Sequence, residues 1–157
     1  MRRAAKIVGA LVGALALVLA VFTALNWAPD RPVAELMDRW AQPPSAFIDI
    51  AGMQVHVRDE GVRDDPAPII LLHGTSASLH TWDGWVRELE PYRRVIRVDM
   101  PGFGLTGPAP DGDYTIEAYV RFATAVLDHF GLERCVLGGN SFGGWVAWDT
   151  ALAQPGR

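Results

Sequence analysis

A short stretch of the sequence carries a serine in a setting that could make it a nucleophile. Gly139-Asn140-Ser141-Phe142-Gly143 is a G-x-S-x-G pentapeptide between an apolar run, 135–137, and a predicted helix. Strand, sharp turn and helix in this order are typical of a nucleophile elbow, which lifts the serine hydroxyl out of the sheet. Because the turn is strained, Gly139 and Gly143 are predicted to be positions where no Cβ fits. A plain Gly/Ser turn is the alternative interpretation.

A serine hydroxyl is a weak nucleophile that needs a base, an acid to orient the base, and donors for an oxyanion. One donor is predicted to be the backbone N–H of Phe142, the residue after the serine. The other comes from a loop after an earlier strand, here His73-Gly74-Thr75, and Thr75 N–H is the candidate. This chemistry needs neither a metal nor a cofactor.

The pattern of apolar residues predicts the elements that hold these groups in place. Alternating runs separated by Ala51-Gly52 predict a β-hairpin, and continuous apolar runs predict strands buried on both faces. The hairpin strands are 47–50 and 53–58, the later strands are 69–72, 95–98 and 134–137, and helices are predicted over 82–89, 116–130 and the segment after Ser141. The fold class is therefore α/β, with a mostly parallel sheet after an antiparallel first hairpin. Ligands of such sheets bind at the carboxyl ends of strands, where His73-Gly74 and Ser141 lie.

Three motifs in this order make the chain resemble the α/β-hydrolase fold family, over a region from Phe47 to the end of the chain. The motifs are Leu71-Leu72-His73-Gly74, Asp99-Met100-Pro101-Gly102-Phe103-Gly104 and Gly139-Asn140-Ser141-Phe142-Gly143-Gly144. The resemblance implies a serine hydrolase, similar to esterases and lipases, that acts on an ester or related acyl bond of a small molecule. It also implies that His73 and Gly74 support the oxyanion loop and that Asp99 is structural. Family members with an aspartate nucleophile include dehalogenases and epoxide hydrolases, and Ser141 argues against both.

The sequence departs from the family pattern after Ser141. The family places an acid and then a histidine after the serine, but here only Asp149 follows and no histidine does. None of the four histidines matches the family's base by position: His56 is expected on a strand with no nearby partner, His80 before a helix, His129 at a helix end, and His73 in the oxyanion loop. The expectation is an amino-terminal part of a hydrolase, truncated after the nucleophile helix and inactive alone.

Two other functions stay open at this point. The Gly-Asn-Ser-x-Gly-Gly form is similar to that of carbon–carbon bond hydrolases of the same fold, and a non-catalytic binding protein could share the fold. Four tryptophans could line an apolar pocket, although such residues are more often core; they are Trp82, Trp85, Trp145 and Trp148. Cys135 is expected to be buried inside its strand. Scattered basic residues and a formal net charge of −4 argue against nucleic-acid binding.

The amino terminus predicts contact with a membrane. Arg2, Arg3 and Lys6 precede an apolar run, 7–25, that is long enough to cross a bilayer as a helix. The basic flank predicts a single-pass anchor with the catalytic domain on the extracytoplasmic side. The alternative is a cleaved signal that leaves a secreted or periplasmic protein. The predicted organisation is an anchor or signal segment over 1–27, a proline-rich stalk with a short amphipathic helix over 28–45, and the hydrolase part over 46–157.

Overall fold

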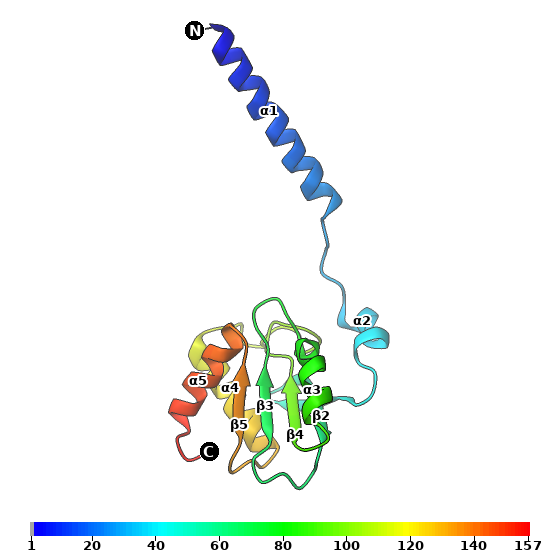
Figure 1. The fold of residues 1–157 in the computed structure, drawn as a ribbon, viewed down its shortest axis with the longest axis vertical. Coiled ribbons are helices and arrows are strands. Elements are labelled where there is room, and N and C mark those ends of the chain that lie inside the picture. Colours follow the sequence, from blue (N-terminus) through cyan, green and yellow to red (C-terminus); the bar gives the residue numbers. More distant parts are fainter. Residues whose placement is uncertain (1) are drawn as a thin grey trace. The chain divides into compact units, whose positions relative to one another are not determined.

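The computed structural model describes residues 2–157, so Met1, the first residue of the predicted anchor, lies outside the described residues. The elements in chain order are α1 (Arg2–Leu25), α2 (Val33–Trp40), β1 (Ser45–Ile50), β2 (Met53–Gly61), β3 (Ile69–Leu72), the 3-10 helix η1 (Leu79–Trp82), α3 (Asp83–Leu89), β4 (Arg94–Val98), α4 (Ile116–His129), β5 (Val136–Gly139) and α5 (Phe142–Ala153) (Figure 1). They fall into two compact units, which divide between Pro32 and Val33.

The amino-terminal unit contains α1. Its mean hydropathy of 2.6 and its 24 residues are sufficient for a helix that crosses a membrane, and they equally fit a signal sequence. At 1.5 Å per residue the helix is about 36 Å long, against a hydrocarbon layer of about 30 Å. Among residues 2–157, α1 is the one helix that meets these criteria.

The second unit is built on a five-stranded sheet with the order β1-β2-β4-β3-β5. The predicted hairpin is confirmed, since β1 and β2 pair antiparallel around Ala51-Gly52, and β2 also pairs antiparallel with β4. The other two pairings, β3 with β4 and β3 with β5, are parallel. The carboxyl ends of β3, β4 and β5 therefore meet at one edge of the sheet, which brings the loops after them together.

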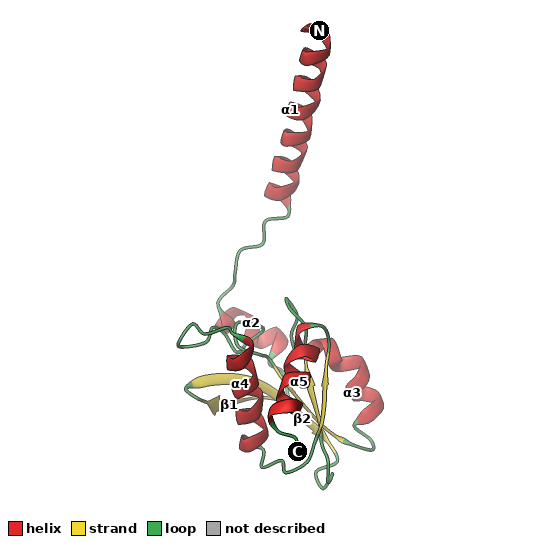
Figure 2. Cartoon of the chain, turned by 90° about the vertical axis from the view of Figure 1, so that its left-hand side faces the viewer, coloured by secondary structure: helices red, strands yellow, loops and turns green. Residues whose placement is uncertain are grey.

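Helices cover both faces of the sheet (Figure 2). On one face α4 and α5 bury an apolar core with alternate residues of the strands, among them Val55, Ile70 and Ile96. On the opposite face α3 packs Val86 against Ile69, Leu71 and Val95. The buried strand residues lose contact with water on both faces, which explains why β3 reads as a continuous apolar run.

Thr115 begins α4 and explains where this helix starts. Its backbone is extended, with φ −68° and ψ 158°, and its side chain accepts a hydrogen bond from the N–H of Ala118 at 3.3 Å. This is the N-cap contact that satisfies one of the free N–H groups of a first helical turn. At the other end Gly131 has φ +62°, which is the left-handed conformation expected of a residue that stops a helix.

The strand before Ser141 differs from its prediction. It spans Val136–Gly139 instead of 134–137, because Val136 pairs with Ile69 and Gly139 with Leu72. Cys135 therefore precedes the strand and is only half-buried, so its predicted burial inside a strand is wrong. Strand pairing with β3 sets the bounds of β5, and the apolar pattern at positions 134–137 does not reveal that register.

One edge of the sheet is open in this chain, because β5 pairs with β3 alone among the described strands. Val136 is 48% exposed there, and a groove of about 310 Å³ lined by Leu137, Ala147 and Trp148 runs beside it. The core interpretation of the tryptophans is wrong for three of the four, since Trp85, Trp145 and Trp148 are exposed.

Candidate active site

Ser141 lies at the sharp turn between β5 and α5. Its backbone has φ 51° and ψ −116°, a combination that non-glycine residues rarely adopt. The residue is exposed, and its side chain makes no capping hydrogen bond to the helix that it precedes. The hydroxyl is therefore free, and it lies at the end of a helix whose N-terminal dipole favours negative charge.

The glycines on either side of Ser141 are required by close backbone contacts. A Cβ on Gly139 would overlap the backbone of Gly143, and a Cβ on Gly143 would overlap the carbonyl oxygens of Leu72 and His73. Both clashes involve backbone atoms, which cannot rotate away as a flexible side chain could. The G-x-S-x-G spacing thus lets α5 pack directly on the ends of β5 and β3.

The loop after β3 lies against the elbow. The N–H of Asn140 donates to the carbonyl of Leu72 at 3.1 Å. A Cβ on Gly74 would lie 2.8 Å from Asn140 Oδ1 and 3.4 Å from Ser141 Cβ, so a side chain at position 74 would collide with the elbow. Within residues 2–157 the backbone N–H groups of Thr75 and Phe142 donate to no other group. Both predicted oxyanion donors are therefore unpaired.

His73 connects the loop after β3 to the loop after β4. Its Nδ1–H donates to the carbonyl of Gly74 at 2.8 Å, and its Nε2 accepts from the N–H of Met100 at 3.0 Å. These partners require the neutral ring, because a carbonyl needs a donor and an N–H needs an acceptor. Burial lowers the pKa of His73 below its ordinary value, although the carbonyl of Gly74 and the nearby carboxylate of Asp99 oppose that shift.

Asp99 follows β4 and is a second buried connector. Its carboxylate accepts from the N–H of Leu79 at 2.7 Å, from the N–H of Leu105 at 2.8 Å and from His56 Nδ1 at 2.8 Å. Burial alone would raise the pKa of Asp99, but the hydrogen bonds from His56, Leu105 and Leu79 outweigh it and hold the pKa below its ordinary value. These three bonds join Asp99 to two loops and to β2, and none of them goes to Ser141.

The contact between His56 and Asp99 corrects one prediction. His56 was expected to have no nearby partner, yet it is fully buried and bonds both to Asp99 and, through Nε2, to Ser45 Oγ at 2.8 Å. A sequence signal does exist: His56 and Arg58 alternate with the apolar Val55 and Val57 and so mark a polar face of β2. That signal does not reveal a partner 43 residues away.

None of the four histidines is placed to act as a base for Ser141. Both ring nitrogens of His73 and of His56 are occupied, and His80 Nε2 bonds to the carbonyl of Trp40 at 2.9 Å. His129 is the last residue of α4, which leads into the amino end of β5, whereas Ser141 follows the carboxyl end of that strand. Asp149, the acid that follows Ser141, lies eight residues further along, about 12 Å at 1.5 Å per residue.

The two buried connectors predict how stability depends on pH. The folded pKa of Asp99 is below the unfolded value of about 3.9, so its contribution is complete above about pH 4 and is lost as pH falls through the folded pKa. The folded pKa of His73 is below about 6.5, so its contribution is lost earlier, as pH falls below about 6.5. We expect the Tm, measured by circular dichroism between pH 8 and 3, to fall in these two steps. Three other carboxyl groups with a lowered pKa contribute to the lower step: Asp65, Asp83 and Asp113. Asp99→Asn should therefore make this step smaller without abolishing it, whereas the exposed Asp64→Asn should leave it unchanged. Equal slopes in both variants would contradict the role of Asp99.

The chain matches the family model described as "alpha/beta hydrolase fold" over residues 67–157. Among curated proteins it is 36% identical over 110 residues to 2-hydroxymuconate semialdehyde hydrolase of Pseudomonas sp. (strain CF600), which covers 68% of this chain and 38% of that protein. It is also 29% identical over 146 residues to epoxide hydrolase 4 of Mus musculus, which covers 83% of this chain and 40% of that protein. The chain thus spans about two fifths of the length of these relatives.

Solved structures agree with the sequence matches. A hydrolase from Pseudomonas aeruginosa PA01 superposes with a TM-score of 0.67 at 28% sequence identity. The superposition covers 73% of this chain and 43% of that one.

Proposed function

Because the chain belongs to the α/β-hydrolase fold family, we propose that it forms the part of a serine hydrolase that carries the nucleophile and the oxyanion hole. The substrate is a small molecule with an ester or related acyl bond. The observation that carries the proposal is the exposed, unpaired hydroxyl of Ser141 at a strained turn, beside the unpaired N–H groups of Thr75 and Phe142. No cofactor takes part in this chemistry.

The proposed reaction has two steps. Ser141 Oγ attacks the acyl carbon while a base takes the hydroxyl proton, and the N–H groups of Thr75 and Phe142 stabilise the negative charge that develops on the acyl oxygen. The leaving group departs with a proton from the same base, which gives an acyl-enzyme. A water molecule, deprotonated by the base, then attacks the acyl carbon. The bond between the acyl carbon and Ser141 Oγ breaks, Oγ takes the proton back from the base, and the acyl group leaves as a carboxylic acid.

The base and its acid are proposed to come from residues outside this chain. The support is geometric, since the hydrogen bonds of His56, His73 and His80 fully or partly engage their rings elsewhere. Residues 46–157 are then the amino-terminal part of the hydrolase domain, and we expect them to be inactive alone. His73 and Gly74, with Gly139 and Gly143, are proposed to support the site.

A carbon–carbon bond hydrolase is the second candidate. The 36% identity to 2-hydroxymuconate semialdehyde hydrolase favours it, together with the Gly-Asn-Ser-Phe-Gly-Gly form of the elbow. The same nucleophile and oxyanion donors serve both reactions, so the bond that is cleaved depends on the pocket that surrounds them.

The test compares substrates on the complete protein, purified with its amino-terminal helix. p-Nitrophenyl acetate and butyrate report ester hydrolysis, and 2-hydroxymuconate semialdehyde reports carbon–carbon bond cleavage. A kcat/KM at least tenfold higher for an ester supports the first candidate, and the reverse order supports the second. If neither substrate nor a fluorophosphonate reacts, the non-catalytic binding protein becomes the better interpretation.

The amino-terminal segment, 1–27, is proposed to be an uncleaved anchor that holds the catalytic domain on the extracytoplasmic side, joined to it by residues 28–45. The length of α1 and the basic residues in front of its apolar run support this. We expect cells to retain the protein in membranes washed with alkaline carbonate, with residues 1–27 still present by mass spectrometry. A soluble form that begins near Ala28 would instead identify a cleaved signal, and with it a secreted or periplasmic protein.

A further inference from the structure

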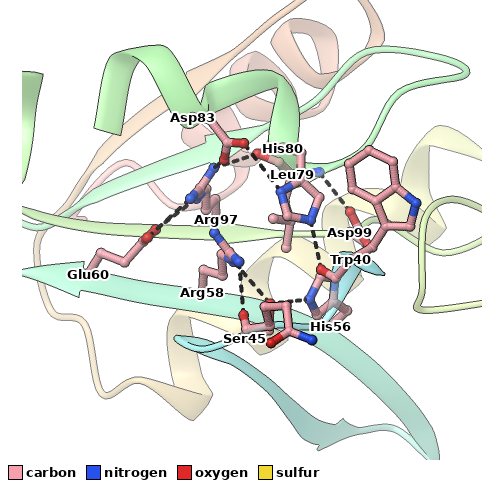
Figure 3. Close-up of polar contacts among 11 residues, drawn as sticks. Trp40, Ser45, His56, Arg58, Glu60, Leu79, His80, Asp83, Arg97 and Asp99 are labelled. Atoms are coloured by element: carbon pink, nitrogen blue, oxygen red, sulfur yellow. Dashed lines mark hydrogen bonds and ion pairs between the residues drawn. The ribbon is translucent and has the colours of Figure 1, made fainter. Parts of the chain in front are cut away.

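The face of the sheet that α3 covers carries charged side chains on β2 and β4 (Figure 3). The opposite face, beneath α4 and α5, is apolar. Because side chains alternate along a strand, this polar face takes every second residue of each strand. The polar and charged residues among them are His56, Arg58 and Glu60 on β2, and Arg97 and Asp99 on and just after β4, whereas Val95 of β4 lies on the same face and packs against α3. Arg97 and Asp99 are each 1% exposed, so these charges depend on one another and on backbone groups for their hydrogen bonds.

A continuous chain of hydrogen bonds leads from Arg58 to Asp99. Arg58 Nε donates to Ser45 Oγ at 3.0 Å, and Ser45 Oγ lies 2.8 Å from His56 Nε2, to which its hydroxyl donates when the neutral ring carries its proton on Nδ1. His56 Nδ1 then donates to Asp99 Oδ2 at 2.8 Å. With His56 in this tautomer all three bonds run in the same direction, an arrangement in which each bond polarises and strengthens the next.

The end of this chain holds the loop that carries Thr75. Asp99 Oδ1 accepts from the N–H of Leu79, and Arg97 Nη1 donates to the carbonyl of the same residue at 3.1 Å (Figure 3). The other end of the loop is held by His73, whose Nε2 accepts from the N–H of Met100. The loop 74–78 is therefore fixed at both ends to residues at and next to the end of β4.

Ser45, His56 and Asp99 have the connectivity of a catalytic triad, so a second nucleophile has to be considered. Two observations argue against it. His56 is 0% exposed, and a ring with no access to solvent cannot pass a proton to a leaving group. Ser45 is the first residue of β1, directly opposite Arg58 in the strand pairing, where the guanidinium occupies its oxygen. The arrangement is better suited to holding Asp99 than to reacting.

We propose that His56 is a positioning residue for the oxyanion hole: its Nδ1–H orients Asp99, which in turn fixes Leu79 and the loop that presents the Thr75 N–H. The inference rests on the proposed function of Ser141. It assigns His56 a role in the rate of acylation, although the residue touches neither substrate nor nucleophile. The loop must hold its N–H within a few tenths of an ångström, since an error of 1 Å can cost about 100-fold in rate.

Two substitutions of His56 distinguish the contribution of Nδ1 from that of Nε2. In His56→Asn the side-chain NH₂ lies close to the place of Nδ1 and can still donate to Asp99, whereas in His56→Gln it lies closer to Nε2 and Ser45. Both variants lose the ring, so stability should fall in both, and further in His56→Gln because the buried Asp99 also loses its side-chain donor. We expect kcat to fall about 10- to 100-fold in His56→Gln with KM within about twofold, and to stay within about threefold of wild type in His56→Asn.

Amide hydrogen exchange tests the inference without any substrate. In the complete protein the N–H groups of Leu79 and Leu105 should exchange slowly in the wild type and in His56→Asn, and about tenfold or more faster in His56→Gln. Equal exchange or equal kcat in the two variants would overturn the inference, as would a fluorophosphonate adduct on Ser45. A wild type without Ser141-dependent turnover would refute the proposed function, and the exchange rates would still decide whether His56 holds the loop.

Discussion

Ser141→Ala is expected to reduce hydrolysis by the complete protein by on the order of 10⁴- to 10⁶-fold, the range known for loss of a nucleophilic serine. The hydroxyl is exposed and unpaired, so its removal deletes the proposed attacking atom without breaking a contact that supports the fold. The Tm should therefore stay the same or rise slightly. The measurement is kcat with the preferred substrate, together with labelling by a fluorophosphonate and mass mapping of the adduct.

Ser45→Ala is the matched control for this experiment, because Ser45, unlike Ser141, has a hydroxyl that contacts a histidine among residues 2–157. The fluorophosphonate adduct should remain on Ser141 in this variant. Turnover that survives Ser141→Ala at a tenth of the wild-type rate or more would remove Ser141 from the mechanism.

Gly143→Ala is expected to destabilise the domain by about 3 kcal/mol or more, above the usual cost of one extra methyl group in a packed core. The added Cβ would overlap the carbonyl oxygens of Leu72 and His73, so either α5 or the end of β3 must move. Because α5 follows Ser141 and the loop with Thr75 follows β3, a shift of either element would displace the candidate site. We therefore expect turnover to fall together with stability. In a domain of this size the Tm should drop by roughly 10 °C, as measured by differential scanning calorimetry.

Gly84→Ala provides the control for the glycine experiment. Gly84 lies in α3, and nothing comes within 4 Å of a Cβ added there. Alanine at that position should stabilise the helix by up to about 1 kcal/mol, because it restricts the unfolded chain and favours the helix. A Gly143→Ala protein as stable as Gly84→Ala would show that α5 can move away from β3 at little cost, and that the G-x-S-x-G spacing is not a packing requirement.

The parts of the site that are close in the sequence could be predicted from it. The turn at Ser141, its two glycines and the unpaired N–H of Phe142 depend on five consecutive residues whose conformation is largely local. The loop at His73-Gly74 could also be located, because it follows a strand of four apolar residues. The structure brings this loop to the elbow through the parallel pairing of β3 with β5.

The parts that depend on pairing between distant segments could not be predicted. The exact span of β5 follows from its register with β3, which an apolar run of variable length does not define. The contact of His56 with Asp99 requires β2 to pair with β4 and to turn its polar face toward α3. The sequence pattern around a histidine on a strand is the same whether its ring contacts water or a buried carboxylate 43 residues away, so the pattern does not predict which contact forms.

The backbone of Ser141 also has an evolutionary consequence. A non-glycine residue at φ 51° and ψ −116° costs the folded state about 1–3 kcal/mol, and a glycine at the same position would avoid most of that cost. Selection for folding alone would therefore replace this serine, whereas the proposed role of Ser141 in turnover would retain it. A copy of the gene that had lost its substrate should drift toward glycine at position 141 before it loses the fold, and screens for thermostable variants should recover the same change.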